Sequence, residues 1–218
     1  MIEKKEKIHY PVSCRENASC LKALTIDYWL SNNSADLIIN EVPFFKGNRR
    51  ADLVIIQGNY LIGFEIKSEL DSLNKLNTQI DDYIKIFDKV YIVIAEKFKN
   101  HLEIRNLPKS VGILVKKQTL QSKKEARQIK KFKKNDLLSI LWRRDLEHLI
   151  NKKGLDIECL KRKVISDVKL EIIKKEIIVS LKKRYGKNYA LFLRDRGNYT
   201  TVEDLKTITR INKNTYFS

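Results

Sequence analysis

The chain of 218 residues is poor in glycine and proline, with only 7 and 3 of them respectively. Collagen-like fibres, linker-dominated chains and sandwiches built on many tight turns are therefore excluded. No apolar run approaches the roughly 20 residues that a membrane-spanning helix needs. The N-terminal stretch is charged where a secretory signal would be apolar. We therefore expect a globular protein of the cytoplasm without a membrane partner.

Patterns that hold metal clusters or nucleotides are also missing. The 3 cysteines form an odd set without a CxxC pair, so they predict neither a disulfide framework nor a zinc site. They fit a reducing compartment. No glycine-rich loop ending in Gly-Lys-Ser or Gly-Lys-Thr occurs, so we expect no nucleotide-driven motor in this chain.

Positive charge is confined to one half of the chain. Residues 1–100 hold 14 Lys+Arg and 14 Asp+Glu, whereas residues 101–218 carry the whole net charge of +17. This asymmetry favours a polyanionic partner, DNA or RNA, for the second half. A lysine-rich solvated surface is the alternative, but it leaves the neutral first half unexplained. The residues that we predict to bind nucleic acid form the basic run 116–134: Lys116, Lys117, Lys123, Lys124, Arg127, Lys130, Lys131, Lys133 and Lys134.

Hydrophobic spacing predicts an α/β fold for the first 117 residues. Two turn sequences, Lys46-Gly47-Asn48 and Gly58-Asn59, separate three β-rich runs, which should form an antiparallel meander. An amphipathic helix and two further strands should extend the sheet. In order, the expected elements are a helix at 19–32 capped by Ser19, strands at 37–45, 51–57 and 60–67, a helix at 71–87 capped by Asp71 or Ser72, and strands at 89–95 and 112–115.

The second half, 118–218, is predicted to be a basic, mainly helical accessory region. The spacing predicts an amphipathic helix over 136–150 with Trp142 on its apolar side. A longer basic helix should cover 160–184 and end at Gly186. From residue 187 onward the pattern predicts no definite structure.

The apolar strands of the meander contain three charged residues, Asp52, Glu65 and Lys67. Glu65 and Lys67 are two apart on one strand and so point to one face, and Asp52 lies on the strand before it. Uncompensated buried charges are costly, so these must pair with each other, be exposed, or bind a metal. Neighbouring carboxylates with open water positions suit Mg²⁺ or Mn²⁺. An exposed ladder of weak salt bridges is the alternative.

The order Asp52, turn, Glu65-Ile66-Lys67 on this frame of helices and strands resembles the PD-(D/E)XK nuclease superfamily. Ala51 stands where that motif often has Pro. The resemblance covers residues 19–117 well and 136–150 loosely. The same block is similar to small bacterial and phage nuclease-like proteins.

Further positions resemble one branch of this superfamily. Gln79 and Tyr83, four residues apart on a predicted helix, resemble the QxxxY motif of the RecB-like nucleases. Glu41 matches the additional acidic residue that many of these nucleases carry. For Gln79 and Tyr83 the alternative is an ordinary polar helix face.

The resemblance implies a restriction-endonuclease-like αβββαβ core with a mixed central sheet at 1–117. It also implies a Mg²⁺- or Mn²⁺-dependent deoxyribonuclease that leaves a 5′-phosphate. Asp52, Glu65, the carbonyl of Ile66 and Glu41 would hold the metal; Lys67, Gln79 and Tyr83 would act on the water and the phosphate. The alternative function is a non-catalytic nucleic-acid-binding or accessory protein on a nuclease frame.

Overall fold

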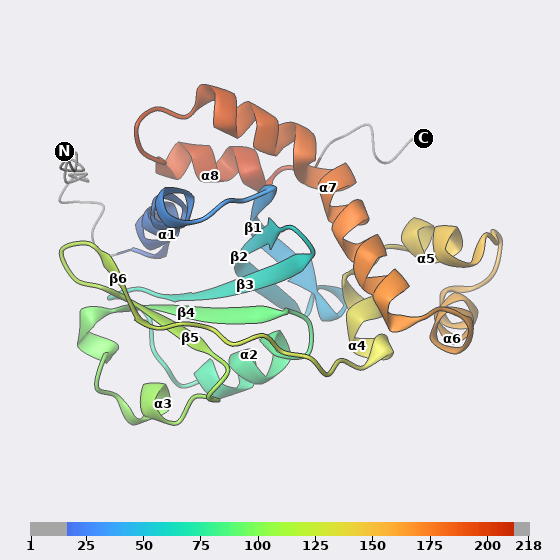
Figure 1. Cartoon of the computed structure of the whole chain (residues 1–218), viewed down its shortest axis with the longest axis horizontal. Coiled ribbons are helices and arrows are strands. Elements are labelled where there is room, and N and C mark those ends of the chain that lie inside the picture. Colours follow the sequence, from blue (N-terminus) through green and yellow to red (C-terminus); the bar gives the residue numbers. More distant parts are fainter. Residues whose placement is uncertain (1–16, 212–218) are drawn as a thin grey trace.

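The computed structural model describes residues 17–211, which form a six-stranded mixed sheet with helices on both faces (Figure 1). The strands lie side by side in chain order. The first three are antiparallel, the third to fifth are parallel, and the sixth is antiparallel to the fifth. The predicted meander is therefore confirmed. The strands are β1 (Leu37–Phe44), β2 (Arg49–Gln57), β3 (Tyr60–Lys67), β4 (Lys89–Ala95), β5 (Gly112–Lys116) and β6 (Leu120–Lys124).

The edge strand β6 was not predicted, and it extends the sheet beyond residue 117. Its sequence, Leu-Gln-Ser-Lys-Lys, has no apolar alternation, and only Leu120 is buried. The strand forms because the outer edge of β5 offers unpaired backbone groups that β6 satisfies. Its polar and basic side chains suit an edge that must not pair further.

Helices cover both faces of the sheet. Trp29 of α1 (Ala18–Asn32) packs edge-on against Phe64 of β3, with ring centroids 5.3 Å apart. Phe87, which follows α2 (Leu76–Tyr83), packs on the other face, where Gly63 leaves room for its ring. Neighbouring residues of a strand point to opposite faces, so α1 and α2 lie on opposite sides. The short helix α3 (Leu102–Arg105) connects β4 to β5.

Two predicted helix starts need correction. The cap of α1 is Asn17 rather than Ser19, because its side chain accepts a hydrogen bond from the Cys20 N–H at 2.9 Å. Helix α2 begins only at Leu76, since Asp71 accepts from the Ser68 N–H at 2.8 Å and so closes a turn before the helix. Cys159 is a free thiol.

The second half is helical, but its helices break where the spacing is continuous. Residues 136–150 form α4, a 3₁₀ turn and α5, and Trp142 caps α5 in an extended conformation. The predicted helix at 160–184 is divided at Val168, whose backbone is extended. The helices are α4 (Lys134–Leu137), η4 (Leu138–Ile140), α5 (Arg143–Ile150), α6 (Ile157–Asp167), α7 (Leu170–Asp195) and α8 (Val202–Thr209).

Helix α7 continues through Gly186, contrary to prediction. A glycine inside a helix costs about 1 kcal/mol relative to alanine. On either side of it Leu181, Tyr185 and Tyr189 are buried, and their burial outweighs that cost. The helix therefore ends only at Asp195.

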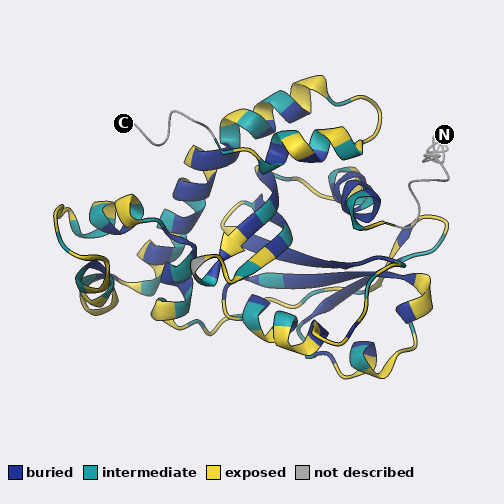
Figure 2. Ribbon diagram, turned by 180° about the vertical axis from the view of Figure 1, so that it is seen from behind, coloured by how far each residue is buried: buried dark blue, intermediate teal, exposed yellow. Residues whose placement is uncertain are grey.

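Hydrogen bonds and an ion pair connect the C-terminal helices to the rest of the fold. Asp27 of α1 is buried and accepts hydrogen bonds from Arg196 at 2.8 Å and from the Thr200 hydroxyl at 2.6 Å. At the other end of α7, Lys174 pairs with the buried carboxylate of Asp88. The buried core extends from the central strands into α7 and α8 (Figure 2). None of the helices described for residues 17–211 is both long and apolar enough to cross a membrane.

Candidate active site

The carboxylates of Glu41, Asp52 and Glu65 lie in one row across β1, β2 and β3, which we call the acidic row. The pairs on either side of Glu41 place it opposite Asp52 in the β1–β2 register. The β2–β3 pairing covers Leu53, the residue after Asp52, which lies opposite Phe64. Extending this register by one residue places Asp52 opposite Glu65. Because backbone pairing between β2 and β3 stops here, side chains from α1 and α2 reach the three carboxylates.

Glu65 is the buried centre of the site. Its side chain is 3% exposed, and protein donors hold both of its oxygens. Oε1 lies 2.9 Å from Lys67 Nζ and accepts from Gln79 Nε2 at 2.6 Å. Oε2 accepts from the Tyr83 hydroxyl at 2.7 Å. Lys67 also donates to Gln79 Oε1 at 2.8 Å, so the structure brings together four of the predicted site residues.

Burial and neighbouring charge perturb this centre. Burial, and next the charge of Asp52, raise the pKa of Glu65 above its ordinary value, against the opposing effect of Lys67. Burial and the Glu65 carboxylate hold the pKa of Tyr83 well above its ordinary value. Tyr83 is therefore a neutral hydroxyl donor at all physiological pH values.

Asp52 connects the buried centre to the open side of the site. Its side chain is 25% exposed, and Oδ2 accepts from the Ile66 N–H at 2.8 Å. Its own N–H donates to the Tyr83 hydroxyl at 3.1 Å. These contacts replace the strand pairing that stops at this position, and they fix the Ile66 peptide beside the Asp52 carboxylate.

Glu41 has a strained backbone, with a φ of 62° in the middle of β1. A non-glycine residue pays about 1–2 kcal/mol in this left-handed region. Its carboxylate contacts Lys22 and lies 3.1 Å from Arg50. Burial alone would raise the pKa of Glu41, but Lys22 and Arg50 lower it below the ordinary value. Strain of this kind clusters at functional sites.

Lys22 is a site residue that sequence reasoning missed. It is 6% exposed on α1, and its ammonium contacts Glu41 and lies 3.1 Å from Asp52 Oδ1. Burial opposes its charge, yet Asp52 and Glu41 raise its pKa above the ordinary value. One signal was available: Lys22 precedes Ile26 by four residues and Trp29 by seven, a spacing that places the three side chains on one face of a helix.

The donors of the site fit a hard divalent cation in kind. Among residues 17–211 no group of three or more His, Cys, Asp or Glu side chains is arranged to hold a metal ion. Glu41 and Asp52 nonetheless offer carboxylate oxygens, the ligands that Mg²⁺ and Mn²⁺ prefer. A cation already stands between them, the ammonium of Lys22. A metal could therefore reach both carboxylates only after Lys22 has released them.

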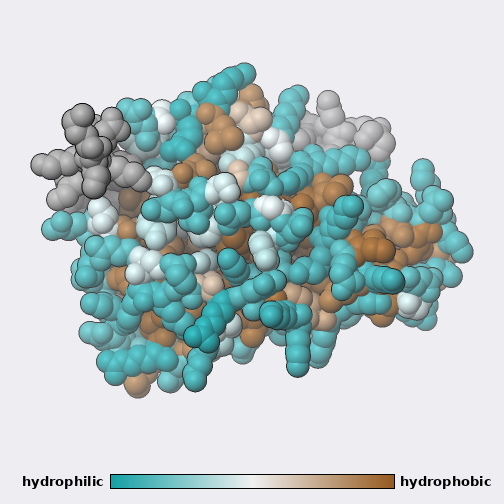
Figure 3. All heavy atoms as spheres, viewed as in Figure 1, coloured by the Kyte–Doolittle hydropathy of each residue, from teal (hydrophilic) through white to brown (hydrophobic). Residues whose placement is uncertain are grey.

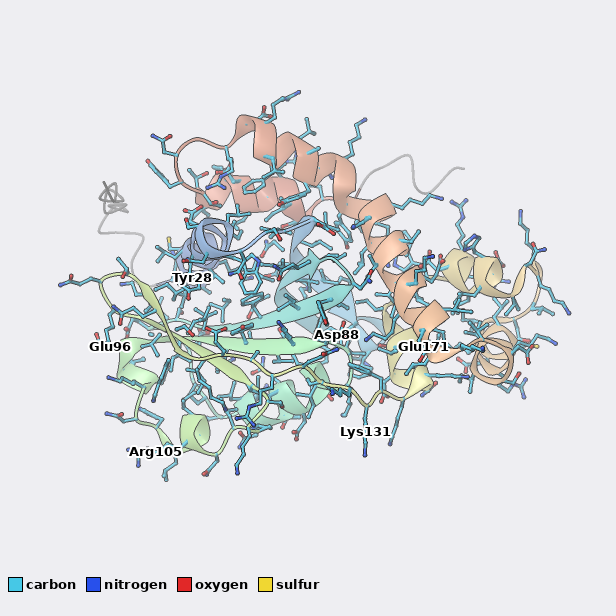
Figure 4. The ribbon with its side chains drawn as sticks, viewed as in Figure 1. Tyr28, Asp88, Glu96, Arg105, Lys131 and Glu171 are labelled. Atoms are coloured by element: carbon cyan, nitrogen blue, oxygen red, sulfur yellow. The ribbon has the colours of Figure 1, made fainter. Side chains whose placement is uncertain are left out.

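The nine predicted nucleic-acid-binding residues do not gather at this row. Lys116 pairs with Ala95, so it lies at the sheet end where β3 and β4 finish. After β6 the chain runs to the other end, where the Ile129 N–H donates to the Asp88 carbonyl at 2.8 Å. In Figure 4 Lys131 accordingly lies on the side of Asp88, across the molecule from Glu96.

This basic strip, the nine residues named above, is long and largely exposed. The β4 partner of Lys67 is Ile94, six residues from Asp88, which corresponds to about 20 Å of strand. None of the nine makes an ion pair with any part of the chain that the structure describes. The face that the strip crosses is mainly hydrophilic in Figure 3. The strip therefore begins at the sheet end that holds Lys67 and runs away from the site toward the opposite end of the sheet.

Residues 14–209 match the family model described as Bacteriophage P4 protein cII. Protein cII of Enterobacteria phage P4 is 32% identical over 189 residues, and the alignment covers 79% of this chain and 69% of that protein. A solved structure of a protein of unknown function from Silicibacter pomeroyi aligns with 55% of this chain and 83% of its own, at 18% identity. The TM-score of this alignment is 0.34.

Proposed function

The chain belongs to the bacteriophage P4 protein cII family, and we propose that it is a Mg²⁺- or Mn²⁺-dependent nuclease that hydrolyses phosphodiester bonds of DNA and leaves a 5′-phosphate. The observation that carries the proposal is the buried network of Lys67, Glu65, Gln79 and Tyr83 beside Asp52. These residues occupy the order and spacing of the PD-(D/E)XK motif and its QxxxY extension. We accordingly propose a restriction-endonuclease-like core.

Burial argues that this network serves chemistry rather than stability. The side chains of Lys67 and Glu65 are 10% and 3% exposed, so the exposed salt-bridge ladder considered above does not describe them. Apolar residues of similar volume at such positions are often as stabilising or more so. A buried ion pair on a central strand is therefore a cost, and perturbed groups of this kind cluster at functional sites.

Lys67 is the residue that we expect to face the substrate. An ammonium has three N–H donors, and the contacts with Glu65 and Gln79 use two of them. The third is left for a phosphate oxygen or the attacking water, where it would stabilise developing negative charge. Gln79 and Tyr83 are positioning residues, because they hold Glu65 and Lys67 rather than the open side of the site.

The divalent cation would be held by Glu41 and Asp52, with Glu65 and the Ile66 carbonyl beside them. When bound, it would lower the pKa of a water ligand and neutralise charge on the phosphate. Glu65 would contribute chiefly by keeping Lys67 charged and in place, since both of its oxygens already accept from protein donors.

The basic strip would hold the nucleic acid. Its side chains lack ion-pair partners within residues 17–211, so their charge is available to phosphates. Burial, and next the charge of Arg127, lower the pKa of Lys124, as expected where like charges gather. Phosphate contacts of this kind position a duplex without reading its sequence.

One observation favours the second candidate, a nucleic-acid-binding protein without catalysis. Lys22 fills the place between Glu41 and Asp52 that a metal would take. The test is cleavage of linear and circular DNA, and of RNA, with Mg²⁺, Mn²⁺ or EDTA, by the wild type and by Lys67→Ala. Cation-dependent cleavage that Lys67→Ala lacks supports the nuclease. Tight binding without cleavage under every condition supports the second candidate.

A further inference from the structure

We propose that Lys22 is an internal counter-ion that occupies the place of a divalent cation between Glu41 and Asp52 and competes with that cation for both carboxylates. The inference rests on the proposed function, because the competing cation is the one that the proposed nuclease would use. It assigns to α1 a role that the sequence motif does not contain.

Lys22 Nζ contacts one oxygen of each carboxylate, and the other oxygen of each already has a partner. Glu41 Oε2 lies 3.1 Å from Arg50 Nη1, and Asp52 Oδ2 accepts from the Ile66 N–H at 2.8 Å. The remaining oxygens, Glu41 Oε1 and Asp52 Oδ1, are those that Lys22 Nζ contacts. Two cations at contact distance from the same two oxygens repel each other strongly. A metal that bridges Glu41 and Asp52 must therefore displace the ammonium.

The arrangement is built into the fold at a cost. Lys22 is almost fully buried on a helix, where a charged side chain is expensive unless it is paired. Glu41 adopts a left-handed backbone conformation within a strand. Both features bring the ammonium and the carboxylate together. An apolar pair at these positions would avoid the cost of burying the charge.

The competition has a measurable consequence in the protein without metal. Lys22, Arg50 and Lys67 already neutralise the row of carboxylates. The wild type therefore does not need a divalent cation for stability, so Mn²⁺ should raise its thermal midpoint only slightly. Removing the Lys22 charge leaves Glu41 and Asp52 without a cation between them, while Arg50 still contacts the other oxygen of Glu41. Such a variant should bind Mn²⁺ more tightly and depend on it for stability.

The experiment measures Mn²⁺ binding by isothermal titration calorimetry and by the electron paramagnetic resonance of free Mn²⁺, on the full chain without nucleic acid. The test variant is Lys22→Met, which keeps the length of the side chain and removes its charge. Arg50→Met is the matched control, because it removes one cation from the other oxygen of Glu41, at a side chain that is 64% exposed. Lys22→Gln is a second neutral variant, which can still donate to Glu41 if Lys22→Met folds poorly.

We expect Lys22→Met and Lys22→Gln to bind Mn²⁺ at least about tenfold more tightly than the wild type, and Arg50→Met to change the affinity by less than about threefold. The thermal midpoint of the Lys22 variants should rise with Mn²⁺ by more than that of the wild type. If the wild type cleaves DNA with Mn²⁺ while the neutral Lys22 variants bind Mn²⁺ equally or more weakly, the counter-ion role is wrong and the proposed function stands. If no variant binds Mn²⁺ and none cleaves, both are wrong.

Discussion

The acidic row and the basic strip use charge in opposite ways. In the row, Lys22, Glu65 and Lys67 are nearly buried, and each charge has a partner of opposite sign at contact distance. In the strip, most of the nine cations are exposed and none has an acidic partner among the described residues. Burial fixes the positions of a few charges at the cost of desolvation, whereas exposure leaves many charges free to attract a polyanion. Precise geometry and long-range attraction therefore come from different parts of one chain.

The largest expected effect is the loss of cleavage when Lys67 is replaced at the acidic row. Lys67→Ala should lower cleavage by about 10²–10⁴-fold, the range expected for a side chain that stabilises the reacting groups. Its affinity for DNA and the salt dependence of that affinity should stay near the wild-type values, because only one buried charge is lost. Lys85→Ala, on the exposed surface after α2, is the control of equal charge and should cleave normally. Normal cleavage by Lys67→Ala would remove Lys67 from the mechanism.

The next largest effect is weaker DNA binding when lysines of the basic strip are replaced. Replacing Lys130, Lys131, Lys133 and Lys134 by Ala should weaken DNA binding across sequences. The slope of log K against log salt should flatten by roughly 2–4 units, since each neutralised phosphate contributes about 0.9. Fluorescence anisotropy over a salt series measures both. Unchanged affinity and slope would make the strip a solvated surface only.

A matched pair of double variants sharpens this measurement. Lys130 and Lys131 are exposed neighbours in the strip, and Lys152 and Lys153 are exposed neighbours after α5. Both double alanine variants remove two charges. The first should flatten the salt slope more than the second if the strip, rather than net charge, holds the nucleic acid.

The part of the fold that sequence predicts well is the part with strong local patterns. The strand runs 60–67 and 89–95 are mainly apolar, and the turn sequence Gly58-Asn59 precedes the first of them. Their predicted bounds agree with β3 and β4. By contrast β6 has almost no apolar pattern and forms because β5 offers an edge. The break at Val168 interrupts a continuous helical spacing, so no local signal marked it.

The site residues also fall into those that a local sequence pattern marks and those that it does not. Asp52, Glu65, Lys67, Gln79 and Tyr83 could be named from their spacing, and the structure places them within hydrogen-bonding contact of one another. Lys22 could not, because its partners lie on strands 19 and 30 positions further along the chain and only the packing of α1 brings them together. The strip was recognised as basic, but its course along β6 to the far end of the sheet depends on the unpredicted strand.

A smaller effect concerns the rigidity of the row. Tyr83→Phe removes the hydroxyl that donates to Glu65 and accepts from the Asp52 N–H, so two buried polar groups lose a partner. We expect a loss of about 1–3 kcal/mol in the free energy of unfolding, measured by urea or thermal denaturation. Tyr60→Phe is the control, since Tyr60 is 38% exposed at the start of β3. Equal stability of both variants would contradict the hydrogen-bonded role of Tyr83.

The smallest effect concerns Glu125, the single acidic residue within the basic run 116–134. Hydrogen bonds from Ser122 and Tyr91 lower the pKa of Glu125 below its ordinary value. A lowered pKa means that the folded protein favours the charged form, so the resulting stability is present above the ordinary pKa of about 4.5 and is lost as the pH falls through the lowered value. The free energy of unfolding of Glu125→Gln should therefore be lower than that of the wild type by at most about 1 kcal/mol at neutral pH, because Glu125 is well exposed to solvent. Below the lowered pKa the wild type and Glu125→Gln should unfold at the same denaturant concentration.

Glu125→Gln also removes the one negative charge from the basic run, so DNA binding at low salt should tighten slightly while cleavage per bound substrate stays unchanged. A loss of cleavage in Glu125→Gln would show that the strip and the row are coupled rather than separate.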